Sequence, residues 1–327
     1  MTILITGSSG HLGEALCRTF EAQGRAYISA DIKTGPYTQE TGDIADAEFS
    51  ARIMKGVRAV LHTATLHKPH VATHSMQDFV DTNITGTLNL LEAAIAEGVG
   101  SFIFTSTTST FGEAMRPPPG SPAVLVTEDL APVPRNIYGV TKLAAENICR
   151  LFHKLHGLPC LILRTSRFFP EEDDKGAIRN AYEDMNAKLN ELTYRRVDIA
   201  DVVSAHLCAL DRAREIGFGR YIISATTPFQ PGDMEELGRN APAVLKRYAD
   251  YEGEYARRGW RMFDTLDRVY VNDLARKELG WNPEFDFLTA LDRIKRNESP
   301  FSLLRDIIGK KGYHDEIFED GPFPVNE

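Results

Sequence analysis

The chain has 327 residues, of which 43% are hydrophobic and 25% are charged, and its formal net charge is −9. This length and composition are typical of a globular protein with one large or two modest domains. Non-specific binding to DNA or RNA needs a cationic surface, so we expect no nucleic-acid partner, although a few local arginines could hold a small anion.

Short apolar runs alternate with helical patterns through the first half of the chain. The runs that predict strands cover 2–6, 26–31, 57–64, 101–106 and 158–165. The patterns that predict helices cover 12–23, 81–97 and 138–156. Strands that are apolar throughout are buried on both faces, so the alternation predicts an α/β fold with a doubly wound parallel sheet of the Rossmann type.

The alternation breaks after Arg164. The stretch that follows is polar, then helical to about Leu192, and one more helix and a strand are expected before residue 226. The rest is rich in proline and charge and ends in an acidic tail. We therefore expect a dinucleotide-binding domain over 1–165, completed by about 195–225. A substrate-binding region with a tail is expected over 166–194 and 226–327.

Cysteine usage and the N-terminus predict a cytoplasmic protein. The four cysteines show no metal-type or redox-type spacing. The first apolar run is too short for a signal peptide, and no segment reaches transmembrane length, so no membrane partner is expected. His67, His70 and His74 have no acidic or cysteine ligand in register, so no metal site is expected.

A glycine-rich turn follows the first predicted strand. In "ITGSSGHLG", Gly7, Gly10 and Gly13 stand between a strand and a helix, where they allow a tight turn, close approach of a pyrophosphate and close helix–strand packing. The helix N-terminus offers free N–H groups to the phosphates. Asp31 ends the second strand, where its carboxylate would bind a ribose diol and repel a 2′-phosphate, which favours NAD over NADP.

The chain resembles the extended short-chain dehydrogenase/reductases of the NAD-dependent epimerase/dehydratase family. The motifs that carry the resemblance are "TGSSGHLG", Asp31, "GDI" (42–44), "LHTAT" (61–65), "NITGTLNLLEAA" (83–94), "FIFTSTTSTFG" (102–112), "YGVTK" (138–142), "LRTSRFFP" (163–170) and "ARKELGWNPEF" (275–285). The resemblance implies a cofactor site made of Gly7, Ser9, Gly10, His11, Leu12, Gly13, Asp31, Asp43, Ile44, Thr63, Ala64, Thr65, Asn83, Thr105, Tyr138 and Lys142. It implies that Asn83 acts by fixing nearby loops or a water.

The same resemblance implies that Thr107, Tyr138 and Lys142 are catalytic. Tyr138 and Lys142 are four residues apart and share one helix face. Removing a hydride from a carbinol carbon requires a base for the hydroxyl proton. A lysine ammonium near a tyrosine, helped by the positive nicotinamide, lowers the pKa of the phenol and makes that base available. Thr107 would support the substrate oxygen.

The substrate is expected to be a sugar, a sugar acid or a nucleotide sugar. Arg167 stands where nucleotide-sugar epimerases commonly have asparagine, and the segment after it is short, which is similar to the uronate dehydrogenase branch. Of the arginines at 167, 179, 195 and 196, we expect Arg167 and Arg196 to bind a carboxylate or phosphate. His67 is a further candidate for substrate contact.

Three functions remain open on the sequence. The first is NAD-dependent oxidation of a sugar or sugar acid, and the second is epimerase or dehydratase activity in the same fold. The third is an NAD-sensing protein without turnover, against which the intact Thr107, Tyr138 and Lys142 set argues. The family resemblance also implies a homodimer through the helices at 81–97 and from 138, where Ile84, Leu88, Leu91 and Ile95 form an apolar stripe, although packing within the chain explains the same stripe.

Overall fold

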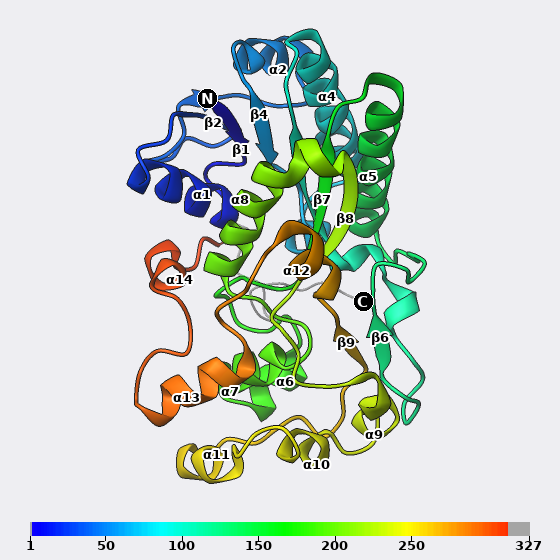
Figure 1. Ribbon diagram of the computed structural model, residues 1–327, viewed down its shortest axis with the longest axis vertical. Helices are drawn as coiled ribbons and strands as arrows, with labels where there is room; N and C mark the ends of the chain where they lie inside the picture. The colour runs from blue at the N-terminus through cyan, green and yellow to red at the C-terminus, as the bar shows by residue number, and fades with distance from the viewer. Residues whose placement is uncertain (1, 313–327) are drawn as a thin grey trace.

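The apolar runs of the first half form one parallel sheet in the computed structural model, which describes residues 2–312. The strand order is β3-β2-β1-β4-β5-β7-β8, and every neighbouring pair is parallel (Figure 1). The strands are β1 (Ile3–Thr6), β2 (Tyr27–Asp31), β3 (Glu40–Thr41), β4 (Ala59–His62), β5 (Phe102–Thr107), β7 (Cys160–Thr165) and β8 (Phe218–Ile223). The predicted fold class, a doubly wound Rossmann-type α/β sheet, is confirmed.

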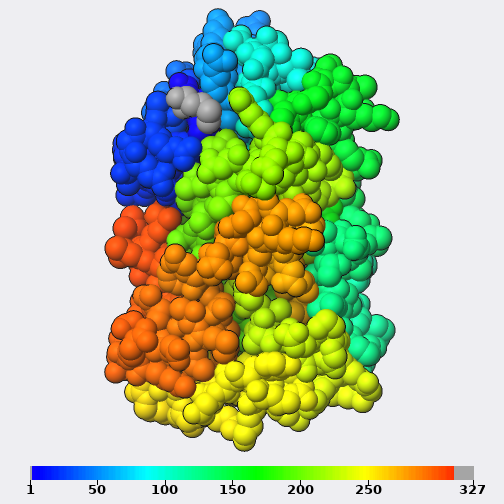
Figure 2. Space-filling view, viewed as in Figure 1, coloured from blue at the N-terminus to red at the C-terminus, as the bar shows by residue number. Residues whose placement is uncertain are grey.

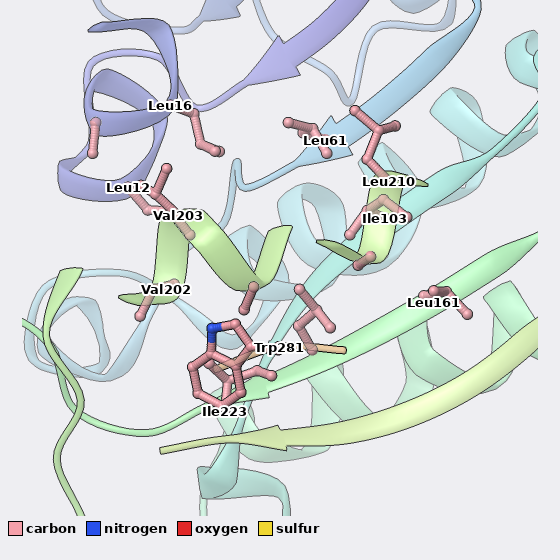
Figure 3. Close-up of a cluster of buried hydrophobic side chains, with 14 of the residues drawn as sticks. Leu12, Leu16, Leu61, Ile103, Leu161, Val202, Val203, Leu210, Ile223 and Trp281 are labelled. Carbon is pink, nitrogen blue, oxygen red and sulfur yellow. The ribbon is translucent and has the colours of Figure 1, made fainter. Parts of the chain in front are cut away.

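Helices cover both faces of this sheet. One face carries α1 (His11–Ala22) and α8 (Ile199–Ile216), and the other carries α2 (Ala47–Met54), α4 (Gly86–Ala96) and α5 (Ile137–His156). In Figure 3, Leu12 and Leu16 of α1 lie with Val202 and Val203 of α8 against side chains of the strands. Because each strand is buried on both sides, the runs read as continuously apolar.

The predicted helix at 81–97 has an irregular beginning. Residues Asp81–Thr85 form a π-helical turn that follows α3 (Met76–Val80) and precedes α4. Such turns are frequent at functional sites. This turn holds Asn83, which is buried. The hydrophobic pattern of the sequence also did not predict the strand β3 or the helix α2.

The remaining elements, most of them from the second half of the chain, build a smaller layer below the carboxyl ends of the strands (Figure 1). It contains a two-stranded parallel sheet of β6 (Val124–Val126) and β9 (Arg268–Tyr270). Its helices are α6 (Gly176–Ala181), α7 (Asp184–Leu192), α9 (Met234–Leu237), α10 (Ala241–Lys246), α11 (Glu252–Arg258) and α13 (Phe287–Lys295). These helices and the small sheet pack around a core that is separate from the cores on the two faces of the large sheet. Elsewhere in the described chain, short 3-10 turns cover Lys68–Ala72, Thr108–Thr110, Glu113–Met115 and Pro231–Asp233.

Residues 226–312 do not belong to the smaller layer alone. Helices α12 (Asp273–Leu279) and α14 (Leu303–Ile308) return to the large sheet, and Figure 2 shows α14, in red, against α1, in blue. Trp281 is buried with α8, and its indole N–H donates to the carbonyl oxygen of Asp201 at 3.1 Å. The Asp201 carboxylate accepts hydrogen bonds from the backbone of Glu284 and Phe285 at 2.8 and 2.9 Å. The acidic tail at 313–327 lies outside the described residues.

Candidate active site

A cavity of about 1400 Å³ runs along the carboxyl edge of the large sheet, between the sheet and the smaller layer. Single small-molecule pockets are typically about 300–1,000 Å³, so the cavity has room for a dinucleotide and a second molecule. It is lined from the ends of β1, β2, β4, β5 and β7, which is the edge where open α/β sheets bind ligands.

The glycine-rich turn closes one end of the cavity. Gly7 has φ of +76°, and a Cβ there would lie 2.7 Å from the amide nitrogen of Ala64. A Cβ at Gly13 would lie 1.9 Å from the carbonyl oxygen of Gly7. The first position therefore needs glycine for its backbone conformation and for the approach of the next strand, and the last lets α1 pack directly on the turn.

Asp31 fixes the turn through both carboxylate oxygens. One oxygen accepts the backbone N–H of Ser9 at 2.9 Å, and the other accepts the backbone N–H of Lys33 at 2.8 Å. The carboxylate lines the cavity beside the glycines. A negative group at this place is suited to a ribose diol and opposes a phosphate on the same ribose.

Most of the residues expected to bind the cofactor line the cavity. Those that do so are Gly7, Ser9, Gly10, His11, Leu12, Gly13, Asp31, Asp43, Ile44, Thr63, Ala64, Thr65, Thr105 and Tyr138. The glycine cradle and the carboxylate at the end of β2 fit a dinucleotide.

Asn83 does not line the cavity. Its amide donates to the carbonyl oxygen of Leu66 at 2.9 Å and to the Thr141 hydroxyl at 3.0 Å, and its oxygen accepts from Thr65 and from the backbone of Leu66 at 2.9 Å each. These contacts hold the loop after β4 in place, and a cofactor-binding role of Asn83 through this loop stays a prediction.

Thr107 and Tyr138 meet on the cavity wall. Thr107 ends β5, Tyr138 lies in the first turn of α5, and their side chains are joined by a hydrogen bond. The neighbouring Ser106 is turned away, because its hydroxyl donates to buried Glu146 at 2.6 Å. Burial raises the pKa of Tyr138 to about 12, although the hydrogen bond to Thr107 acts in the opposite direction. In the protein alone the phenol is therefore protonated at neutral pH.

Lys142 lies one turn along α5, behind the cavity wall. Its Nζ donates to the carbonyl oxygen of Thr105 at 2.6 Å and stands 4.0 Å from the centre of the Phe104 ring. Burial lowers the pKa of Lys142 to about 7, although the charge of Glu146 acts against this. Lys142 does not line the cavity in this arrangement. Among the described residues, no cationic side chain acts on the pKa of Tyr138, so lowering of the phenol pKa by Lys142 stays a prediction for the protein with its cofactor bound.

Of the two arginines that are expected to bind the substrate, only one lines the cavity. Arg167 lines the cavity and pairs with Asp174, as expected for a candidate. Arg196 does not line it, because its Nε donates to Glu191 at 2.7 Å and its Nη1 to the carbonyl oxygen of Phe169 at 2.9 Å. The expectation for Arg196 is corrected: Arg195 is the neighbour that reaches the cavity.

His67 also lines the cavity, and its ring stacks on Phe169 with the ring centres 5.4 Å apart. Across residues 2–312, no three His, Cys, Asp or Glu side chains are grouped so as to hold a metal ion. In the same part of the chain, no helix combines the length and the apolar character needed to cross a bilayer.

The C-terminal segment closes the cavity near the glycine turn. The Glu171 carboxylate accepts His11 Nε2 at 2.9 Å and the backbone N–H of Lys311 at 3.0 Å, and Lys311 Nζ pairs with Glu14. His11, Glu171 and Lys311 all line the cavity. We call residues 310–312 the strap. Nothing in the spacing of residues indicated it, because its partners lie about 140 and 300 positions away in the chain.

Sequence reasoning also missed Tyr194, Phe263 and Arg268, which line the cavity from the smaller layer. Tyr194 and Phe263 form an edge-to-face pair with ring centres 6.2 Å apart. Arg268 is the first residue of β9, and a strand of three residues gives only a weak pattern in the sequence.

Comparisons with known proteins agree with this geometry. A family model, the NAD dependent epimerase/dehydratase family, matches residues 3–223. A UDP-glucose 4-epimerase from Rhizobium meliloti is 27% identical over 320 residues, covering 87% of this chain and 93% of that protein. A dTDP-glucose 4,6-dehydratase from Streptomyces antibioticus is 25% identical, covering 90% and 91%. A short-chain dehydrogenase/reductase superfamily protein from Agrobacterium tumefaciens with bound NAD has a similar structure, with a TM-score of 0.63, 22% identity and coverage of 91% and 95%.

The family model spans more than half of the chain and includes the glycine turn, Asp31, Thr107, Tyr138 and Lys142. The chain therefore belongs to the NAD dependent epimerase/dehydratase family.

Proposed function

We propose that the protein oxidises a hydroxyl of a sugar or sugar acid with NAD, using Tyr138 as the proton acceptor. When bound, NAD supplies the hydride acceptor and a positively charged ring. The glycine turn and Asp31 would hold the pyrophosphate and the adenosine ribose, and Asp43 and Ile44, which also line the cavity, would contact the adenine. The cavity beyond Thr107 then receives the substrate.

The proton path runs through Thr107 and Tyr138. Thr107 hydrogen-bonds the substrate oxygen, and Tyr138 takes its proton as the carbinol becomes a ketone. Burial favours the neutral phenol, so Tyr138 accepts a proton only when positive charge nearby lowers its pKa. The Nζ of Lys142 donates a hydrogen bond to the carbonyl oxygen of Thr105, which holds the last part of β5, and with it Thr107, in place beside Tyr138.

The observation that carries the proposal is the contact of Tyr138 with Thr107 on the wall of a cavity whose other end is the glycine turn. The test is Tyr138→Phe, which keeps the ring and removes the hydroxyl. We expect a loss of turnover of at least about 100-fold, typical of losing a general acid–base group, with NAD affinity almost unchanged. The control is Tyr248→Phe, since the hydroxyl of Tyr248 bonds Asp233 outside the cavity. Full turnover by Tyr138→Phe would show that the proton takes another route.

A second candidate is an epimerase or dehydratase, in which the ketone is reduced or rearranged before release. Two observations favour it: the names of the curated relatives, and the strap across the cofactor end of the cavity. An enzyme that returns the hydride does not need to release its cofactor. Sugars, uronic acids and nucleotide sugars should be screened with NAD while NADH absorbance is followed. NADH that accumulates in step with product supports oxidation, and conversion without net NADH supports the second candidate.

We also propose that the protein forms a homodimer through α5, and that the smaller layer is its substrate-binding region. The stripe on α4 is largely explained by packing within the chain, because Leu91 is fully buried and Leu88 and Ile95 pack against the same core. The exposed apolar side chains lie instead on α5, where Val140, Leu151 and Leu155 are 49%, 48% and 63% exposed.

A further inference from the structure

The strap joins the first turn of α1 to the polar segment that follows β7. The Glu171 carboxylate accepts hydrogen bonds from His11 Nε2 at 2.9 Å and from the backbone N–H of Lys311 at 3.0 Å, and both bonds end on the same oxygen, Oε1. The ammonium of Lys311 pairs with Glu14, which lies in the first turn of α1. Because α1 begins at His11, the strap is fixed to the helix end whose N–H groups are suited to a pyrophosphate.

Glycines border the strap on both sides. Gly309 joins it to α14 with φ of +62° and ψ of −170°, a conformation that is essentially restricted to glycine, and Gly312 at its other end has φ of +66°. Before Gly309, the side chain of Ile308 is buried in the core that α14 shares with α1. A change of backbone angles at Gly309 can therefore move the strap without disturbing that core.

The closed strap is held by opposed contributions. Glu171 is 4% exposed, and its second oxygen, Oε2, is buried without a hydrogen-bond partner among the described residues. A buried carboxylate oxygen that lacks a donor is costly, which disfavours the closed strap. The pair of Lys311 with Glu14 favours it, because the Glu14 side chain is 6% exposed and loses this cation when the strap opens. The strap is therefore closed but able to open.

We propose that the strap is a latch, and that the cavity exchanges NAD and NADH only while the strap is open. Lys311 and Gly312 line the cavity together with Ser9, Gly10 and His11, so the strap borders the place where the glycine turn would hold a dinucleotide. The contacts that close the strap join protein groups to one another. A latch that is equally stable with and without cofactor changes the rates of exchange and leaves the affinity almost unchanged. The inference rests on NAD binding and does not depend on the proposed oxidation.

The test measures cofactor exchange without any sugar. Stopped-flow fluorescence follows NADH binding at several concentrations and NADH release after a chase with excess NAD. Lys311→Met keeps the length of the side chain and removes its charge. We expect this variant to raise both the association and the dissociation rate constant of NADH about 10-fold, as the loss of one charge-assisted hydrogen bond implies, with the dissociation constant within about twofold of the parent.

A second variant should open the strap without changing a charge. Gly309→Ala places a Cβ 3.9 Å from the carbonyl oxygen of Asp306, which is an ordinary contact, so its effect comes from the backbone conformation. It should also raise both rate constants. The matched control is Lys310→Met, because the ammonium of Lys310 pairs at 3.4 Å with exposed Glu172, and an exposed pair contributes little. This control should exchange NADH at the rates of the parent.

Two results would overturn the proposal. One is exchange of NADH at the parent's rates by both Lys311→Met and Gly309→Ala, with melting temperatures showing that the variants are folded. The other is a rise in the dissociation rate constant alone, with a matching loss of affinity, because Lys311 would then bind the cofactor directly instead of acting as a latch. The oxidation proposal fails on a different measurement, the sugar screen, so the two failures are distinguishable.

Discussion

Replacing Lys142 with methionine should stabilise the fold at neutral and acidic pH while removing activity. Burial lowers the pKa of Lys142 from 10.5 to about 7. Each pKa unit corresponds to about 1.4 kcal/mol, so holding the charged form in the fold costs roughly 5 kcal/mol below pH 7. Methionine fills similar space without that charge.

The gain is smaller than this cost, because two contacts are lost. The Nζ of Lys142 donates to the Thr105 carbonyl, and an unsatisfied buried carbonyl costs about 1–3 kcal/mol. The contact with the face of Phe104 contributes about 1 kcal/mol more. We therefore expect Lys142→Met to be roughly 1–3 kcal/mol more stable than the parent at pH 6.

The pH dependence has a definite sign. Between about pH 7 and 10.5 the unfolded chain holds a proton on Lys142 that the folded chain has lost, so the parent becomes more stable as the pH rises through this range. The advantage of the variant should be complete below pH 7 and should disappear toward pH 10.5. There the variant should be the less stable protein, because it lacks the bond to Thr105.

The assay is urea unfolding at pH 6, 8 and 10, followed by the fluorescence of buried Trp281. Titrating groups that do not interact with Lys142 cancel in the difference, and burial holds two groups that are coupled to it, His62 and Cys149, in their neutral forms in both proteins. Lys154→Met, on the exposed side of the same helix, is the matched control for removing one lysine side chain. If the difference in unfolding free energy between Lys142→Met and the parent is the same at all three pH values, the reasoning about the burial of Lys142 is refuted.

Two further predictions concern the cofactor and the assembly. Asp31→Ala removes the acceptor for the N–H groups of Ser9 and Lys33, and it should lower the affinity for NAD more than the affinity for NADP. Both affinities are measured by fluorescence titration. Equal affinity of the parent protein for NAD and NADP would contradict the role of this carboxylate. Leu155→Glu on the exposed face of α5 should convert a dimer to a monomer, as measured by light scattering after size exclusion. The exposed Lys154→Met variant is the control and should stay dimeric. A parent protein that is already monomeric excludes this interface.

The sheet and the cofactor end of the site could be predicted because their signals are local. A buried strand, a glycine turn and a helix start follow one another within 13 residues, and the steric reasons for Gly7 and Gly13 are borne out by the geometry. The fold and the lining of the cavity by Gly7, Gly13 and Asp31 follow directly from such patterns.

The substrate end could not be predicted in the same way. Arg195 and Arg196 are neighbours, and which of them faces the cavity depends on the turn that ends α7 and on the bridge between Arg196 and Arg167. A shift of one residue exchanges the two side chains. Arg268 and the strap reach the cavity from distant parts of the chain, so no spacing in the sequence reveals them.

Burial is the main cause of the shifted pKa values of Tyr138 and Lys142 on α5. Burial raises the pKa of Tyr138 and lowers that of Lys142, so both groups are driven toward their neutral forms. A positive charge placed in the cavity would lower both pKa values, because it favours the phenolate and disfavours the ammonium. Binding of a cationic ring would then activate Tyr138 while making Lys142 a neutral hydrogen-bond donor. On this account Lys142 contributes by holding Thr105 and the end of β5, and the charge that activates Tyr138 arrives with the cofactor.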